Sequence, residues 1–75
     1  WMQNKIAFSD ESLLNVSRML ERRFDVQFRW TNEEVKSYTY TGIYENESLR
    51  KILEVLSLSQ KFTYSVENRT VTIGK

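Results

Sequence analysis

Hydrophobic and polar residues change their spacing along the chain in an ordered way. Ile6 and Phe8 alternate with their neighbours, which predicts a short strand. From residue 13 the apolar residues recur three or four positions apart, which is typical of the buried stripe of an amphipathic helix. From residue 26 the period returns to two, so Val26, Phe28 and Trp30 share one face of a second strand. The N-terminal part of the chain therefore predicts the order strand, helix, strand.

The remainder of the chain follows the same order. A polar segment over residues 31–37 leads into an alternating stretch that ends at Tyr44, and a second helical stripe follows. Two more alternating stretches, 62–66 and 70–73, are separated by Asn68, a residue that tolerates the left-handed conformation of tight turns. We therefore expect a strand, a helix and a C-terminal β-hairpin. The two helical stripes are Leu13, Val16, Leu20 and Phe24, and Leu49, Ile52, Leu53 and Leu56.

Polar residues mark where each helix is expected to begin. Asp10 and Asn46 precede the two stripes, and their side-chain oxygens can accept the unpaired N–H groups of a first helical turn. The carboxylate of Asp10 would also complement the positive end of the helix dipole. We therefore predict that Asp10 and Asn46 are the N-caps of the two helices.

The two halves of the chain align after a shift of 36 positions, the separation of Ser12 from Ser48. The shift places Leu20 on Leu56, which are both expected in the core, and it also superposes the expected caps and the flanking strands. Two amphipathic helices can be aligned by chance, but the agreement at caps and strands favours an internal repeat. The predicted repeat covers residues 6–28 and 42–64.

Together these elements predict one α+β domain over residues 1–75, built from duplicated β-α-β units plus a C-terminal β-hairpin. Gly42 occupies the position of Ile6 in the repeat. A glycine inside a strand often marks the close approach of another backbone, so we expect the second helix to press against Gly42. Because the sequence begins at Trp1, we expect the chain to be a fragment of a longer protein.

Composition removes most kinds of site chemistry. The chain has no cysteine and no histidine, so it lacks thiolate ligands, cysteine nucleophiles and the most frequent general base. Its carboxylates do not follow the spacing of a calcium loop. We therefore expect no enzymatic activity, no metal and no cofactor.

Charge and hydropathy argue against two further classes. With 11 basic and 10 acidic residues the net charge is +1. The pI of about 8.2 is below the value of roughly 9 that is typical of nucleic-acid-binding domains. No apolar run approaches the roughly 20 residues that span a bilayer. We expect no nucleic-acid partner and no membrane helix within these residues.

A few charged and aromatic residues are candidates for contact with a partner. Trp30 and Tyr38 lie next to the polar link and could be exposed at an interface. Five basic residues could form a patch, although a solvated helix face paired with Glu21 is the favoured interpretation. These basic residues are Arg18, Arg22, Arg23, Arg29 and Lys61.

Several segments taken together resemble a known family. The chain opens with Trp1 and carries KIAF at 5–8, LERRFDV at 20–26, YTGIY at 40–44, SLRKILEVL at 48–56, FTY at 62–64 and TVTI at 70–73. Over nearly its whole length it resembles the C-terminal domain of FecR-family anti-sigma factors. That family usually has a glycine in the turn after the first Trp, and here Asn4 is expected to take the positive φ angle instead.

The resemblance implies two helices packed between a two-stranded and a three-stranded sheet. It also implies the periplasmic domain of an inner-membrane single-pass protein, whose cytoplasmic part restrains an extracytoplasmic-function sigma factor. The expected function is a non-catalytic relay from the signalling domain of a TonB-dependent outer-membrane receptor. The alternative is a structural or signalling module of a secretin or TonB-dependent receptor, because these modules have a similar β-α-β repeat.

Strand addition at an exposed sheet edge is the favoured mode of binding. In this mode backbone groups supply affinity and alternate side chains select the partner. The stretch from Lys36 to Thr41 is the expected edge. The expected partner-binding residues are Arg29, Trp30, Lys36, Tyr38 and Tyr40.

Overall fold

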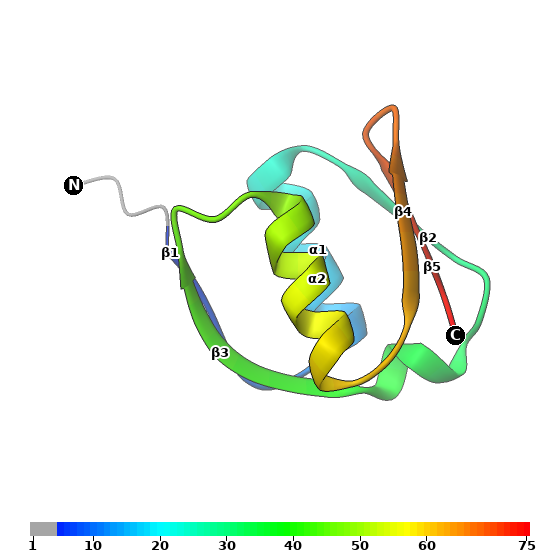
Figure 1. Cartoon of the computed structure of the whole chain (residues 1–75), viewed down its shortest axis with the longest axis horizontal. Coiled ribbons are helices and arrows are strands. Elements are labelled where there is room, and N and C mark those ends of the chain that lie inside the picture. The colour runs from blue at the N-terminus through cyan, green and yellow to red at the C-terminus, as the bar shows by residue number, and fades with distance from the viewer. Residues whose placement is uncertain (1–4) are drawn as a thin grey trace.

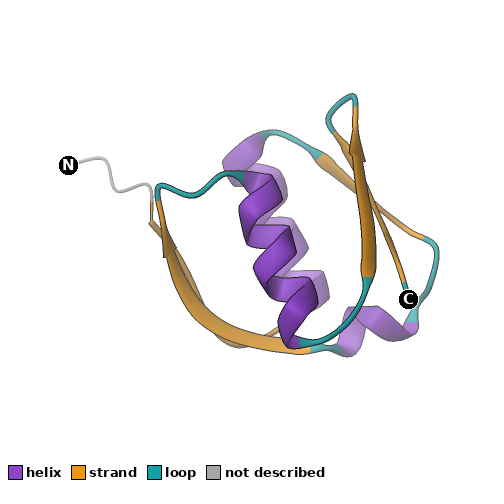
Figure 2. Cartoon of the chain, in the orientation of Figure 1, coloured by secondary structure: helices purple, strands orange, loops and turns teal. Residues whose placement is uncertain are grey.

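The computed structural model describes residues 5–75, which form two α-helices, a short 3₁₀ helix and five strands (Figure 2). In chain order they are β1 (Lys5–Ser12), α1 (Leu13–Phe24), β2 (Gln27–Trp30), the 3₁₀ helix η1 (Glu34–Ser37), β3 (Thr39–Glu45), α2 (Leu49–Ser59), β4 (Thr63–Glu67) and β5 (Thr70–Gly74). Asn4, for which a positive φ angle is expected, lies outside the described residues.

Both α-helices lie between two sheets (Figure 1). One sheet pairs β1 with β3 in antiparallel orientation. The other has the order β2-β5-β4, in which β2 is parallel and β4 antiparallel to the central β5. This arrangement confirms the α+β architecture of two helices between a two-stranded and a three-stranded sheet.

The two halves of the chain contribute to the sheets in the same way. Each of the segments 6–28 and 42–64 runs from a strand through a helix into a strand. The first strands, β1 and β3, pair with each other, and the second strands, β2 and β4, lie on either side of β5. Each sheet is therefore built from both halves. Because the helices lie between the two sheets, strands of both halves also pack against each helix.

A single core joins the halves. Leu20 is fully buried and Leu56 is 2% exposed, as the helical stripes predict. Val35 is also fully buried, although it lies in the segment expected to be a polar link. One apolar residue in a polar segment has no period, so the hydrophobic pattern alone could not place it. The core consists of Phe8, Leu13, Val16, Leu20, Val35, Tyr40, Ile52, Leu53, Leu56, Phe62, Val71 and Ile73.

The helix N-caps are Ser12 and Ser48, so the prediction of Asp10 and Asn46 is wrong by two residues. Each serine Oγ accepts the N–H of the residue three positions along, at 3.2 Å. Asp10 and Asn46 instead take left-handed φ angles of 53° and 56°. Asp and Asn favour both N-cap and left-handed positions, so residue type did not distinguish these two roles.

A β-bulge accounts for the conformation of Asp10. The register of β1 against β3 shifts by one residue between Phe8 and Glu11. Asp10 lies within this interval, and a left-handed residue is common in bulges because it bends the strand locally. Its backbone N–H donates to Oγ1 of Thr41 at 2.9 Å. The bulge therefore carries β1 past the point where helix α1 was expected to begin.

Gly42 lies beside the ring of Tyr44 rather than beside α2. A Cβ atom on Gly42 would lie 3.3 Å from the Tyr44 hydroxyl oxygen and 3.4 Å from its Cε2 atom. The expected contact with the second helix is therefore wrong, because an aromatic ring of the same strand covers the glycine. The Tyr44 ring also lies 5.8 Å from that of Phe8, centroid to centroid.

The C-terminal hairpin turns at Asn68 and Arg69, as the sequence predicts for this region. Both residues are left-handed, with φ angles of 49° and 61°. Nη1 of Arg69 lies 2.9 Å from Oδ2 of Asp25, the left-handed C-cap of α1. This exposed ion pair connects the hairpin with the end of the first helix.

Replacing Leu20 with Asp is expected to unfold the domain. A buried carboxylate without a partner costs several kcal/mol, which is comparable to the total stability of about 5–15 kcal/mol of a small domain. Thermal melting followed by circular dichroism measures the effect. The control Arg18→Asp places the same charge on an exposed position of α1 and should melt close to wild type. Equal melting of the two variants would contradict the core assignment.

Ser48→Ala is expected to lower the free energy of unfolding by about 1 kcal/mol, because the first turn of α2 loses its side-chain acceptor. Asn46→Gly should leave the stability unchanged or raise it by up to about 1 kcal/mol, because glycine adopts a left-handed φ angle without strain. Urea denaturation of both variants measures the difference. A greater loss for Asn46→Gly than for Ser48→Ala would show that Asn46 is the cap after all.

Candidate functional site

Four strand edges are the candidate interaction sites. Within residues 5–75, only β5 has a neighbouring strand on both sides, so β1, β2, β3 and β4 each have one side without a partner strand from this range. The unpaired N–H and C=O groups of such an edge can bind a strand from another chain. The four edges differ in how far the protein itself covers them.

The edge of β3 is the longest that no bulge interrupts. The carbonyl of Tyr38 accepts the N–H of Leu13 at the end of β1, at 2.7 Å, so the backbone groups of even-numbered residues point toward β1. The carbonyl of Thr39 points the opposite way and accepts from Nε2 of Gln60 at 2.6 Å. By alternation, the backbone groups of Thr41, Ile43 and Glu45 also point away from β1. Among residues 5–75, a side chain bonds the outward carbonyl of Thr39, but none bonds the outward groups of Ile43.

The edges of β1 and β2 are interrupted. The bulge at Asp10 breaks the regular spacing of β1. On β2, the N–H groups of Gln27 and Thr31 donate to carbonyls at or next to β5, so the N–H of Phe28 points outward. Oε2 of Glu21 accepts this N–H at 2.9 Å. A side-chain carboxylate therefore occupies the middle of a strand that has only four residues.

The edge of β4 is open but shorter. β4 has five residues, and the two-residue turn pairs Glu67 with Thr70. In such a hairpin the residues that flank the turn bond each other, so the outward groups belong to Tyr64 and Val66. β4 thus offers two residues to a partner strand, whereas β3 offers three.

The predicted edge over Lys36 to Thr41 begins too early in the chain. Lys36 lies in η1, and β3 begins at Thr39. Residues Glu34–Ser37, just before β3, form the helical turn η1, and the buried side chain of Val35 holds this turn in place. Lys36 is therefore not in an extended conformation. The open edge therefore runs over Thr39–Glu45.

The expected partner-binding residues fall into three groups. Nζ of Lys36 lies 5.4 Å from the ring centroid of half-buried Trp30, a cation–π contact, and 2.8 Å from Oε1 of Glu33. Tyr38 is half-buried beside η1, whereas Arg29 is exposed on β2. Tyr40 is different, because its side chain is buried in the core. The structure therefore brings Trp30 and Lys36 together but leaves Tyr40 without a group for a partner strand, because its backbone groups point toward β1.

Tyr40 is held in place by the end of α2. Its hydroxyl donates to the carbonyl of Gln60 at 3.1 Å, and its ring meets that of Phe62 edge-on. Burial raises the pKa of the Tyr40 phenol, with smaller contributions from Tyr38 and Tyr44. Burial also raises the pKa of Tyr44. Both phenols stay protonated at neutral pH, so neither is suited to act as a general base.

The C-terminal residue is attached to η1. Nζ of Lys75 lies 2.7 Å from Oε1 of Glu34. The hydrogen bond from Lys75 lowers the pKa of the Glu34 carboxyl, and the same contact raises the pKa of Lys75. Both groups are exposed to solvent, so this pair orients the end of the chain more than it stabilises the fold.

The expected pairing of Glu21 with the basic residues of the patch is not found within residues 5–75. The carboxylate of Glu21 is used by the backbone of β2. Arg18 and Arg22 are exposed on α1, and neither forms an ion pair with another of residues 5–75. Arg29 lies on β2 and Lys61 follows α2, so the five basic residues come from three different parts of the fold.

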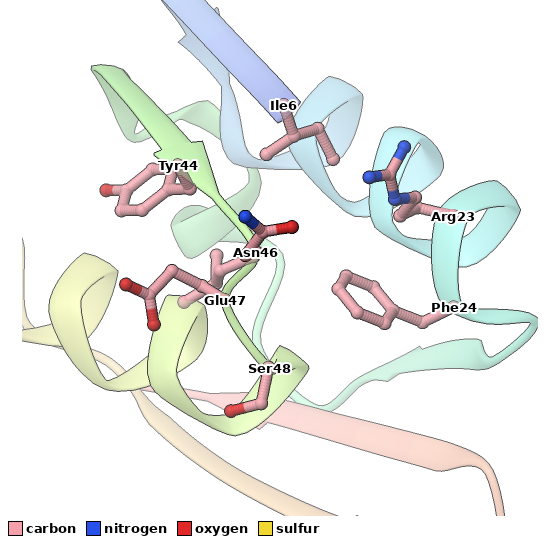
Figure 3. Close-up of a pocket in the computed structure, with 8 residues that line it drawn as sticks. Ile6, Arg23, Phe24, Tyr44, Asn46, Glu47 and Ser48 are labelled. Carbon is pink, nitrogen blue, oxygen red and sulfur yellow. The ribbon is translucent and has the colours of Figure 1, made fainter. Parts of the chain in front are cut away.

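A cleft of about 460 Å³ opens where the end of α1 faces the start of α2 (Figure 3). Ile6 and Tyr44 line it from the two strands of one sheet, and Phe24 lines it from α1. Arg23 and Glu47 place opposite charges around its mouth. These side chains can supply apolar contact and charge. Ser48 also lines the cleft, and its Oγ accepts the N–H of Lys51 as the N-cap of α2.

Residues 5–75 contain no cluster of three or more Asp or Glu side chains placed to hold a metal ion. Over the same range, neither helix is long and apolar enough to cross a bilayer.

Sequence reasoning overlooked Ile43 and Glu21. Ile43 is 64% exposed and stands at a polar position of the alternation in β3, between exposed Thr41 and Glu45. An apolar residue out of phase in a strand was the available signal for Ile43. Glu21 gave no signal, because its partner is a backbone group seven residues away.

The family comparison covers almost the whole chain. A family model described as "FecR, C-terminal" matches residues 5–73, which includes both halves and the hairpin. No curated protein matches the sequence.

Solved structures share the fold over its full length. Two crystal structures of a candidate anti-sigma factor from Parabacteroides distasonis ATCC 8503, at 1.65 and 2.50 Å resolution, match with TM-scores of 0.88 and 0.87. Sequence identity is 23% in both, and the match covers 100% of this chain and 35% of the other. At this identity the likeness concerns the fold alone, and this chain spans about a third of the length of the solved protein.

Removing the carboxylate that covers β2 is expected to expose the backbone of Phe28. In Glu21→Ala the Phe28 N–H loses its acceptor, so its hydrogen exchange should accelerate about tenfold and unfolding should become easier by about 1–2 kcal/mol. Glu21→Gln keeps an oxygen that can accept the bond and should lie between Ala and wild type. Amide exchange by NMR measures this, and unchanged exchange of Phe28 in Glu21→Ala would contradict the cap.

Proposed function

The chain belongs to the family of FecR C-terminal domains, and on this basis we propose that it is the periplasmic protein-interaction domain of an anti-sigma factor. In this proposal the domain binds the signalling domain of a TonB-dependent outer-membrane receptor. Other parts of the full-length protein cross the inner membrane once and restrain an extracytoplasmic-function sigma factor. Occupancy of the receptor is thereby passed to the sigma factor.

The open edge of β3 is the observation that carries this proposal. A strand of the receptor domain could continue the two-stranded sheet there, because the outward backbone groups of Thr41, Ile43 and Glu45 lie on one side. The fold around this edge is held by the core, so docking needs no refolding of the domain. Backbone pairing of this kind is a common basis for peptide recognition.

The proposal assigns no reaction to this domain. Its supporting observation is the absence of histidine and cysteine from the sequence. A relay of this kind works by a change in binding, so it needs only a surface whose affinity differs between two states of the partner.

The 75-residue chain is expected to bind the isolated signalling domain of the receptor encoded beside its gene. Calorimetry should give a dissociation constant on the order of micromolar, which is typical of a small transient interface. The unfolded variant Leu20→Asp is the matched control, because it keeps the composition but loses the sheet edge. Absence of binding by the folded chain at concentrations on the order of 100 times that constant would contradict the proposal.

A further inference from the structure

We propose that β3 receives the partner strand over only three residues, Thr41, Ile43 and Glu45, and that this strand has an apolar residue beside Ile43 and a basic residue beside Glu45. This inference rests on the proposed function, because it describes the chemistry of the strand that docks. It predicts an antiparallel strand with the order basic, any, apolar, any, polar.

Two features delimit the docking segment. At the start of β3 the amide of Gln60 already occupies the carbonyl of Thr39. At its end Asn46 takes a left-handed φ angle of 56°, which turns the chain out of the extended conformation. Between these two points the outward groups of Thr41, Ile43 and Glu45 form an uninterrupted series.

Ile43 supplies the apolar contact. Its side chain is 64% exposed on the face of the sheet that points away from the helices. It also lines an open hollow of about 620 Å³ together with Ala7 of the neighbouring strand β1. An added strand would place its own side chain directly beside Ile43, and an apolar residue there would remove both surfaces from water.

The acidic side chains at the C-terminal end of β3 determine the kind of residue expected beside them on the partner strand. Glu45 and Glu47 are both exposed, and neither forms an ion pair with another of residues 5–75. Lys5 lies opposite Glu45 on β1 but forms no ion pair with it. A Lys or Arg on the partner strand would therefore approach Glu45 from the open side of β3.

The same charges argue for a different protein rather than a second copy. If two copies of β3 paired in antiparallel orientation about Ile43, each Glu45 would lie opposite a Thr41 of the other copy. The carboxylates would then gain no cation. A partner strand with a basic residue would place a cation beside the Glu45 carboxylate, which self-pairing does not.

The rival edge of β4 provides matched controls. Ser65 and Glu67 are exposed side chains of β4, and their own backbone groups point toward β5 rather than toward the open edge. Ile43→Lys places a charge on the β3 edge, and Ser65→Lys places the same charge on β4. Glu45→Lys and Glu67→Lys form a second matched pair.

The test measures binding of these four variants of the 75-residue chain to the receptor signalling domain, after circular dichroism has shown that each is folded. Ile43→Lys should weaken binding at least about tenfold and Glu45→Lys about threefold to fivefold. Ser65→Lys and Glu67→Lys should bind within about twofold of wild type. Equal losses from the β3 and β4 variants, or normal binding by Ile43→Lys, would overturn the inference.

A charge swap tests the pairing directly. A synthetic hairpin peptide with the predicted order should shift the amide signals of Thr41, Ile43 and Glu45 in NMR titrations. The same peptide with Glu in place of its basic residue should bind Glu45→Lys better than wild type. Failure of this reversal would refute the assigned contact with Glu45. If the receptor domain binds the β3 variants as tightly as wild type, only this inference fails, whereas absence of any receptor binding contradicts the proposed function.

Discussion

The structure depends on how the backbone hydrogen bonds of two very narrow sheets are satisfied. A sheet of two strands has only edge strands, and a sheet of three has one strand with partners on both sides. Exposed N–H and C=O groups along an edge attract other chains, so small β proteins usually interrupt or cover them. In this domain β1 is interrupted by a bulge and β2 by the Glu21 carboxylate, whereas β3 stays open over three residues. The four edges therefore differ in how far other parts of the domain cover or interrupt them.

The core explains why such narrow sheets are sufficient. Each helix lies between strands of both halves, and a single set of buried apolar residues is shared by all of them. Val35 closes this core from the link between the halves, and Lys75 is tied to the same turn through Glu34. Gln60 connects the end of α2 with β3, because its carbonyl accepts the Tyr40 hydroxyl while its amide donates to Thr39. The open edge of β3 is thus anchored to the core at the point where it begins.

Hydrophobic spacing was a reliable guide to what is buried in regular elements. It placed Leu20 and Leu56 in the core and the turn at Asn68, because period and turn chemistry are properties of neighbouring residues. It was less reliable at boundaries, where Asp10 and Asn46 were taken for caps although they are left-handed residues outside the helices. Ser12 and Ser48 were available at the right positions, but residue preference alone could not rank them above Asp and Asn.

The sequence by itself determined the order of elements, the apolar stripe of each helix and the absence of histidine and cysteine chemistry, because all of these can be read from residue types and their spacing. Only the tertiary structure decided which edges remain open. The hydrogen bond from the Phe28 N–H to Glu21 and the bond from Gln60 to Thr39 each depend on where whole elements come to lie. Such contacts join residues with no periodic relation, so they follow from packing in three dimensions and not from local pattern.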